Sequence, residues 1–162
     1  MEFCTADLCD EFEDLSIVQP GFRIFGGLKK MSGQIVTIKT FEDNSKVREL
    51  VGTPGLGKVL VVDGGASMNC ALLGDNLARM AVENQWQGIV INGCLRDSAI
   101  IDQMDLSVRA LNTHPRKTIK RGLGDVNVTV SFSGVQFEPG AYLYADEDGI
   151  IVSSKALVET KT

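Results

Sequence analysis

The feature that most restricts the fold is a pair of short apolar runs with a helical stretch between them. The runs are Lys58–Asp63 (KVLVVD) and Gly88–Gly93 (GIVING). Consecutive rather than alternating apolar residues are typical of strands buried on both faces, as in parallel sheets. Asp75–Gln85 lies between the runs and has the composition of an amphipathic helix. The pattern therefore predicts a strand–helix–strand unit of an α/β sheet.

The flanking sequence adds further elements of both kinds. Gly33–Phe41 is rich in β-branched residues and predicts a strand, and Asn44 precedes a probable helix. Thr5 is a candidate cap for a short N-terminal helix. Asp125–Phe132 alternates polar and apolar residues, which predicts a strand with one buried face. With no repeat and no linker, residues 1–162 are expected to form one α/β domain of layered sheets with helices on one side.

Composition narrows the class of protein. The chain has 162 residues, of which 44% are hydrophobic and 23% charged, a balance typical of globular proteins. Its net charge of −5 disfavours direct binding to nucleic acid. No apolar run reaches the roughly 20 residues that cross a bilayer, and the acidic N-terminus does not resemble a signal peptide. We therefore expect a soluble, cytoplasmic protein without membrane contact.

Two residue types limit the chemistry. The four cysteines form no CxxC pair and His114 is the only histidine, so a zinc site or a histidine-activated nucleophile is disfavoured. Carboxylates, an arginine and a metal are the remaining candidates for catalysis. The basic cluster Arg116, Lys117, Lys120 and Arg121 is expected to be a solvated loop or a docking surface rather than a phosphate-binding groove.

Gly74–Leu77 (GDNL) begins the predicted helix between the two buried strands. The free N–H groups of a helix start, together with its dipole, form a small anion site that suits a carboxylate. The simpler alternative is that Asp75 only caps the helix.

Arg96 and Asp97 follow the second buried strand. Ligands of α/β sheets gather at the carboxyl ends of strands. Arg96 is suited to clamping a carboxylate, and Asp97 offers a hard oxygen ligand for Mg²⁺ or Mn²⁺. The alternative is an exposed ion pair of little consequence. Asp75 and Arg96 have 20 residues between them, so one helix could return the chain to the same edge and place both segments in one pocket.

On these motifs the sequence resembles the RraA-like family, which includes the class II 4-hydroxy-4-methyl-2-oxoglutarate aldolases. The resemblance covers nearly the whole chain. Besides the two segments above, it is carried by Cys9-Asp10, Phe25–Gly27, Phe41–Asn44, Val61–Gly65 and Leu143–Asp146. It implies a swivelling β/β/α fold, assembled as a ring-shaped homotrimer with sites near the subunit interfaces.

The resemblance also implies roles for single residues. Asp97 would bind the divalent metal, Mg²⁺ or Mn²⁺. Arg96 would bind substrate and stabilise an enolate. Gly74, Asp75, Asn76 and Leu77 would contact the substrate through backbone groups, and Asp75 would order a metal-bound water that takes the substrate's hydroxyl proton. Asp75 and Arg96 are thus the expected catalytic residues.

Two functions follow from the resemblance. The first is a metal-dependent lyase that cleaves the 2-oxo acid 4-hydroxy-4-methyl-2-oxoglutarate, with oxaloacetate decarboxylation through the same pyruvate enolate. The second is regulation of ribonuclease E by protein contact. Asp97 favours the lyase, because the regulators lack this residue. Ile100 departs from the aldolase pattern, which has an acidic residue there, with Asp102 two positions further on. The longer catabolic aldolases also carry further C-terminal sequence, and both differences concern the physiological substrate.

Overall fold

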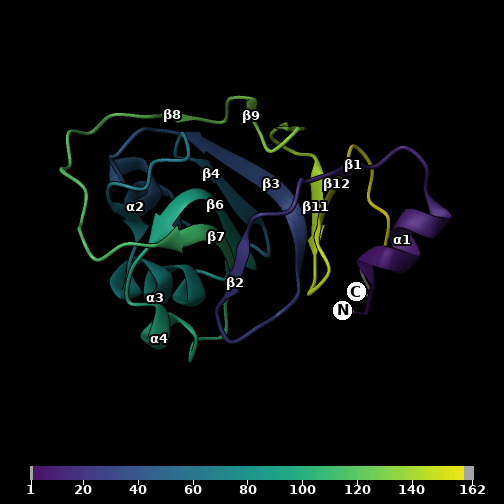
Figure 1. The fold of residues 1–162 in the computed structure, drawn as a ribbon, viewed down its shortest axis with the longest axis horizontal. Helices are drawn as coiled ribbons and strands as arrows, with labels where there is room; N and C mark the ends of the chain where they lie inside the picture. Colours follow the sequence, from purple (N-terminus) through teal and green to yellow (C-terminus); the bar gives the residue numbers. More distant parts are fainter. Residues whose placement is uncertain (1, 159–162) are drawn as a thin grey trace.

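The computed structural model describes residues 2–158 and contains a long, curled mixed sheet (Figure 1). Its main path runs β1–β12–β11–β3–β4–β6–β7–β2, with β5 added to β6 and β8 to β3, while β9 and β10 form a separate hairpin. Strands β3, β4, β6 and β7 are parallel neighbours, and the strands toward both edges are antiparallel. The strands are β1 (Ser16–Ile17), β2 (Arg23–Phe25), β3 (Met31–Lys39), β4 (Val59–Asp63), β5 (Ala71–Leu73), β6 (Gly88–Leu95), β7 (Ser107–Thr113), β8 (Asp125–Val126), β9 (Val130–Phe132), β10 (Val135–Phe137), β11 (Tyr142–Ala145) and β12 (Ile150–Ser153).

Three helices cover one face of the parallel strands, and a fourth lies beyond the antiparallel edge (Figure 1). The covering helices are α2 (Ser45–Val51), α3 (Asp75–Glu83) and α4 (Ser98–Ile101). Helix α1 (Thr5–Glu11) packs next to β11 and β12, where Leu8 contacts the cluster of Tyr144 and Ile151. In the described part of the chain, no helix has the length and hydrophobicity needed to cross a membrane.

The central strands separate two apolar cores because alternate residues face opposite sides. On β4, Leu60 and Val62 join the core beneath the helices, whereas Val59 and Val61 join the core shared with the β9–β10 hairpin. Every residue of β4 and β6 is buried. Burial on both faces is the physical reason that these two runs are apolar at consecutive positions. The layered α/β arrangement expected from the sequence is therefore confirmed.

Two local expectations were wrong, and one strand was not expected. Asp125–Phe132 is not one strand, because the left-handed backbone of Asn127 (φ 59°) divides it into β8 and β9. Thr5 does not cap α1 but lies within it, and its hydroxyl donates instead to the buried carboxylate of Asp146. The short strand β5 was not anticipated. Its sequence, Ala-Leu-Leu, has no β-branched residue and forms a strand because it pairs with the end of β6.

The buried central strand should dominate the free energy of unfolding. Ile91 on β6 is fully buried, so Ile91→Ala should lower that free energy by about 2–5 kcal/mol through lost burial and a cavity. Ile17→Ala, at a side chain that is 59% exposed, should cost less than about 1 kcal/mol. Urea denaturation followed by circular dichroism measures both, and equal losses would contradict this assignment of the core.

Candidate active site

A small cavity of about 90 Å³ lies where β5 and β6 end. It brings together Gly74–Leu77 from the first loop with Arg96 and Asp97 from the second. The two segments singled out in the sequence therefore share one cavity, as their spacing indicated. The remaining residues that line it are Asn44, Arg48, Ala71, Lys117, Thr118 and Lys120.

The pairing of β5 with β6 holds the two loops against each other. The backbone N–H of Arg96 donates to the carbonyl oxygen of Leu73 over 2.9 Å. One step further, the backbone N–H of Asp75 donates to Oδ2 of Asp97 over 3.1 Å. Asp75 is thus not the helix cap: Gly74 occupies the cap position without a side-chain bond, and Asp97 supplies the capping oxygen from the other loop.

Two backbone features allow this close approach. Asp97 has a left-handed conformation (φ 59°, ψ 36°), which aspartate adopts more readily than most residues. Gly74 faces it, and a Cβ atom at Gly74 would lie only 3.0 Å from Asp97 Oδ2 and 3.4 Å from Arg96 Nε. A Cβ at position 74 would push the carboxylate or the guanidinium aside by a few tenths of an ångström, so glycine favours this close approach.

The first turn of α3 also offers hydrogen-bond donors to the cavity. Among residues 2–158, the N–H groups of Asn76 and Leu77 have no acceptor, whereas that of Ala78 bonds within the helix to Gly74. The helix dipole adds partial positive charge at the same point, so this turn suits a carboxylate. Asp75 lies 3.8 Å from Arg79, an ion pair between partly exposed side chains that contributes little to stability.

The basic cluster has a more specific position than the sequence suggested. Lys117 and Lys120 line the cavity together with Arg48, so these residues are not simply a solvated loop or a remote docking surface. The concentration of four basic residues within six positions of an acidic chain was a usable signal. What the sequence lacked was the path of the chain, which returns after β7 to pass over the ends of β5 and β6.

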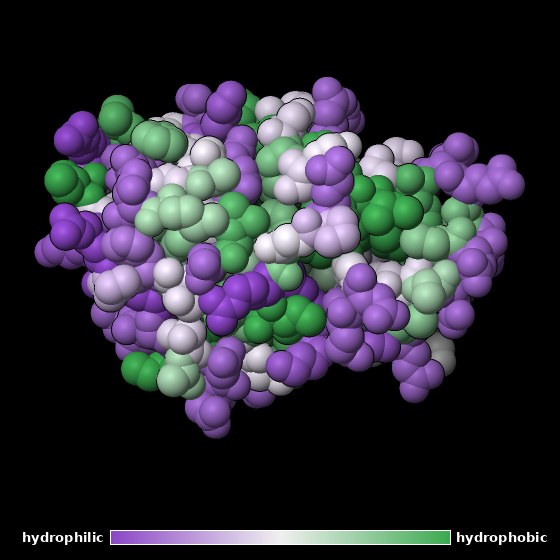
Figure 2. Space-filling model, in the orientation of Figure 1, coloured by the Kyte–Doolittle hydropathy of each residue, from purple (hydrophilic) through white to green (hydrophobic). Residues whose placement is uncertain are grey.

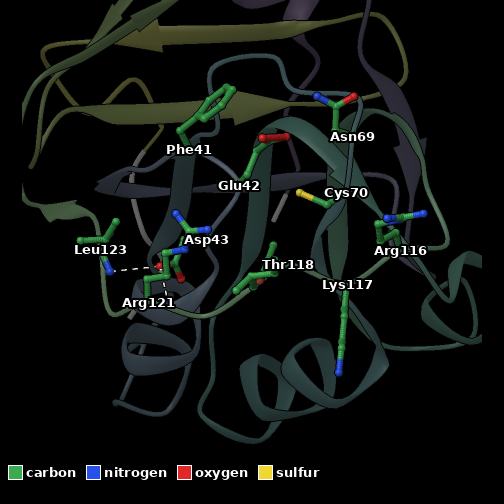
Figure 3. A pocket seen from close by; sticks show the side chains of 11 residues that line it. Phe41, Glu42, Asp43, Asn69, Cys70, Arg116, Lys117, Thr118, Arg121 and Leu123 are labelled. Carbon is green, nitrogen blue, oxygen red and sulfur yellow. Dashed lines mark hydrogen bonds between the residues drawn. The ribbon is translucent and has the colours of Figure 1, made fainter.

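A larger cavity of about 450 Å³ adjoins the first and shares Lys117 and Thr118 with it. Figure 3 shows Asp43 next to the segment that carries these residues, with hydrogen bonds from the backbone N–H groups of Arg121 and Leu123. The cavity is lined by Phe41, Glu42, Asp43, Asn69, Cys70, Arg116, Lys117, Thr118, Ile119, Arg121 and Leu123. The two cavities are thus neighbours on either side of Lys117 and Thr118.

The carboxylates at the small cavity can be compared with the ligands that a divalent cation requires. Among residues 2–158, no three His, Cys, Asp or Glu side chains come together as a metal cluster. Asp97 and Asp75 do place carboxylates at the same small cavity. Mg²⁺ typically uses one or two protein carboxylates, keeps several waters and takes oxygens from the substrate. Asp97, fixed by its bond from Asp75, fits the role of such a ligand.

Comparison with known proteins shows to which protein family this chain belongs. The family model described as "Aldolase/RraA", RraA-like, matches residues 5–152. A protein of Dechloromonas aromatica named "Putative 4-hydroxy-4-methyl-2-oxoglutarate aldolase" is 59% identical over 162 residues, covering 97% of this chain and 99% of that protein. One of the same name from Pseudomonas aeruginosa (strain LESB58) is 57% identical, covering 97% and 98%. This chain belongs to the RraA-like family.

Solved structures agree on the fold but carry different names. The RNA-processing inhibitor RraA of Thermus thermophilus superimposes with a TM-score of 0.94 at 38% identity, covering 100% of this chain and 99% of that one. A Geobacillus kaustophilus protein titled a 2-dimethylmenaquinone methyltransferase gives 0.93 at 46%, covering 99% and 100%. The swivelling β/β/α fold is thus confirmed. Because one fold carries several named activities, function has to be argued from the site.

The buried carboxylate beside the site should make stability depend on pH. Burial raises the pKa of Asp43, but hydrogen bonds from Ser45, Leu123 and Arg121 outweigh it and lower the pKa to about 2. A carboxyl whose pKa is lower in the folded than in the unfolded chain stabilises the fold above its unfolded pKa of about 4. We expect this contribution, about 2 kcal/mol, to be lost as the pH falls from about 4 toward 2.

The measurement is urea unfolding of the wild type and Asp43→Asn between pH 6 and pH 2.5. The variant should be less stable near neutrality, and the difference should shrink in acid. Ile17→Ala, which removes no ionisable group at an exposed position, is the control and should show no such convergence. A difference that stays constant across this range would contradict the assignment.

Proposed function

We propose that this chain is a divalent-metal-dependent lyase that cleaves 4-hydroxy-4-methyl-2-oxoglutarate to pyruvate and also decarboxylates oxaloacetate. The observation that carries the proposal is the single cavity in which Asp97, Arg96 and the free N–H groups of α3 meet. The names of relatives that are 59% and 57% identical over nearly their full length support the same reaction.

Different residues of the cavity would bind different groups of the substrate. The N–H groups of Asn76 and Leu77 would bind the carboxylate next to the keto group, and Arg96 would face the keto oxygen. Mg²⁺ or Mn²⁺ held by Asp97 would act as a Lewis acid that spreads the negative charge developing on that oxygen. Arg96 adds a second, fixed positive charge at the same place, so no lysine Schiff base is required.

The bond changes are the same at the reacting carbons in both reactions. In the aldol cleavage, the C4 hydroxyl loses its proton, the C3–C4 bond breaks and its electron pair forms the enolate of pyruvate, while C4 becomes the ketone of a second pyruvate. Asp75 would take the hydroxyl proton through a bound water. In oxaloacetate, carbon dioxide leaves instead, and the same enolate is then protonated at C3.

The second carboxylate of the substrate has a partner in the basic residues. Lys117 and Lys120 line the same cavity as the GDNL turn. A dicarboxylic acid bound by its 2-oxo acid end at α3 would direct its other carboxylate toward these lysines. Two cations there would offset the repulsion that a dianion meets from a chain of net charge −5.

We further propose that the chain assembles as a homotrimer with the site near a subunit interface. Three apolar side chains, Phe41, Ile119 and Leu123, line the larger cavity and are 63%, 70% and 59% exposed. Figure 2 shows hydrophobic groups at the edge where the segment between β7 and β8 runs (Figure 1). Apolar groups gathered beside a site are typical of a surface that another subunit covers.

Regulation of ribonuclease E by protein contact is the second candidate. The observation in its favour is the close structural match to the RNA-processing inhibitor RraA. Asp97 and the position of Lys117 and Lys120 inside the cavity favour the lyase. The two functions make different demands on Asp97, because only the lyase needs a metal ligand there.

Replacing Asp97 by asparagine should abolish the metal-dependent reaction. The amide keeps the shape but removes the negative charge that binds the cation, so pyruvate release from either substrate should fall by about 100-fold or more. EDTA should have the same effect on the wild type, reversed by Mg²⁺. Asp105→Asn, at an exposed aspartate that precedes β7 at the opposite end of the sheet, is the control and should retain activity. Full activity of Asp97→Asn, or indifference to EDTA, would contradict the proposal.

Sedimentation equilibrium tests the assembly. We expect the mass of a trimer of the 17.5 kDa chain, and we expect Leu123→Asp to weaken it by placing a charge in the apolar surface. Ile17→Asp, at an exposed apolar residue far from the cavity, is the matched control. A wild type that is monomeric at micromolar concentration would rule out the trimer.

A further inference from the structure

Asp43 is a buried carboxylate that is fully occupied by hydrogen bonds. Only 2% of its surface is exposed. Oδ1 accepts the backbone N–H of Ser45 over 2.9 Å and its hydroxyl over 2.5 Å, and Oδ2 accepts the backbone N–H groups of Arg121 over 2.8 Å and Leu123 over 3.1 Å (Figure 3). Four donors leave this carboxylate no capacity for a ligand, so its part in the site is indirect.

The segment Thr118–Leu123 depends on these bonds for its position. In the described part of the chain it forms no helix or strand and makes no backbone–backbone hydrogen bond. Its N–H groups bond instead to side chains from the start of α2. Gly122 donates to the hydroxyl of Ser45 over 3.1 Å, and the hydroxyl of Thr118 donates to the side-chain oxygen of Asn44 over 2.8 Å. The side chains of residues 43–45 thus supply the hydrogen bonds that a neighbouring strand would otherwise give this segment.

The first half of this segment lies beside the active-site cavity. Lys117 precedes it and Lys120 lies within it, and both line the small cavity with Arg96 and Asp97. On its other side the chain is attached through the bond from the Ala71 N–H to the Arg116 carbonyl, over 2.7 Å. Lys120 is therefore held between the Arg116 contact and the bonds to Asp43.

We propose that Asp43 is a positioning residue that holds Lys117 and Lys120 over the cavity and so sets the preference for dicarboxylic over monocarboxylic 2-oxo acids. The inference rests on the proposed lyase function. Asp43 acts at a distance from the reacting atoms, because its oxygens contact only the backbone and Ser45. It should therefore change the binding of the second carboxylate and leave enolate formation unaffected.

The test compares two reactions of the same site in Asp43→Asn. An asparagine side chain has one acceptor oxygen, so it cannot accept from both Ser45 and the Arg121–Leu123 pair. For cleavage of 4-hydroxy-4-methyl-2-oxoglutarate we expect KM to rise about tenfold, with kcat changed less than about twofold. Exchange of the methyl protons of pyruvate with deuterium needs only one carboxylate, and its rate and KM should match the wild type.

Asp146→Asn is the matched control. Asp146 is also buried, and its carboxylate also accepts several hydrogen bonds, from Thr5 and Asp148, but it anchors α1 at another part of the molecule. This variant should lose stability and keep both KM values. Ser45→Ala removes one donor to Asp43 and the acceptor of Gly122, so it should show a smaller effect of the same kind and serves if Asp43→Asn does not fold.

A double-mutant cycle tests whether Asp43 affects KM through Lys117 and Lys120. In a Lys117→Ala, Lys120→Ala background, Asp43→Asn should raise KM no further. An unchanged KM in folded Asp43→Asn, equal effects on cleavage and exchange, or full additivity with the lysine variants would each overturn the inference while leaving the lyase intact. If the wild type shows neither metal-dependent cleavage nor exchange, the lyase proposal itself fails.

Discussion

The pairing of β5 with the end of β6 is the contact on which the site depends. Three residues of strand place Leu73 beside Leu95, and the bond from the Arg96 N–H to the Leu73 carbonyl continues the ladder to the first residue of the next loop. From there the left-handed turn at Asp97 directs its carboxylate to the first N–H of α3. Gly74 lacks the side chain that would keep these groups apart. Without this pairing, the two loops would have no fixed relation.

The charge distribution within the cavity differs from that of the chain. The protein is acidic overall, but Arg48, Arg96, Lys117 and Lys120 line one small space with only Asp75 and Asp97 to balance them. A local excess of positive charge attracts dianions even when the net charge is negative, because screening limits the reach of distant surface charges to about 10 Å. The net charge of the whole chain therefore does not predict how this cavity interacts with small anions.

Much of the fold was predictable, and the misses share one cause. The sequence predicted the buried strands β4 and β6 and the helix between them, because the hydrophobic pattern of each segment reflects its own local environment. The strand β5, the break at Asn127 and the role of Thr5 were not. Each of these involves a partner distant in sequence: β6 for β5, Asp146 for Thr5, and the Thr37 carbonyl, which accepts the Asn127 N–H, for the break. Tertiary contacts override the local secondary-structure propensity where they contribute more stabilisation than that propensity does.

The sequence by itself determined the family, the α/β layers and the two segments, Gly74–Leu77 and Arg96-Asp97, that meet in the cavity, because spacing and residue type are properties of the chain. Their individual roles in binding and catalysis stay predictions. Only the tertiary structure decided that Asp97 rather than Asp75 caps α3, and that Lys117 and Lys120 belong to the same cavity. It also revealed that Asp43 secures the segment carrying Lys120. These facts join residues 20 to 80 positions apart, and no local pattern encodes which backbone N–H a carboxylate will find.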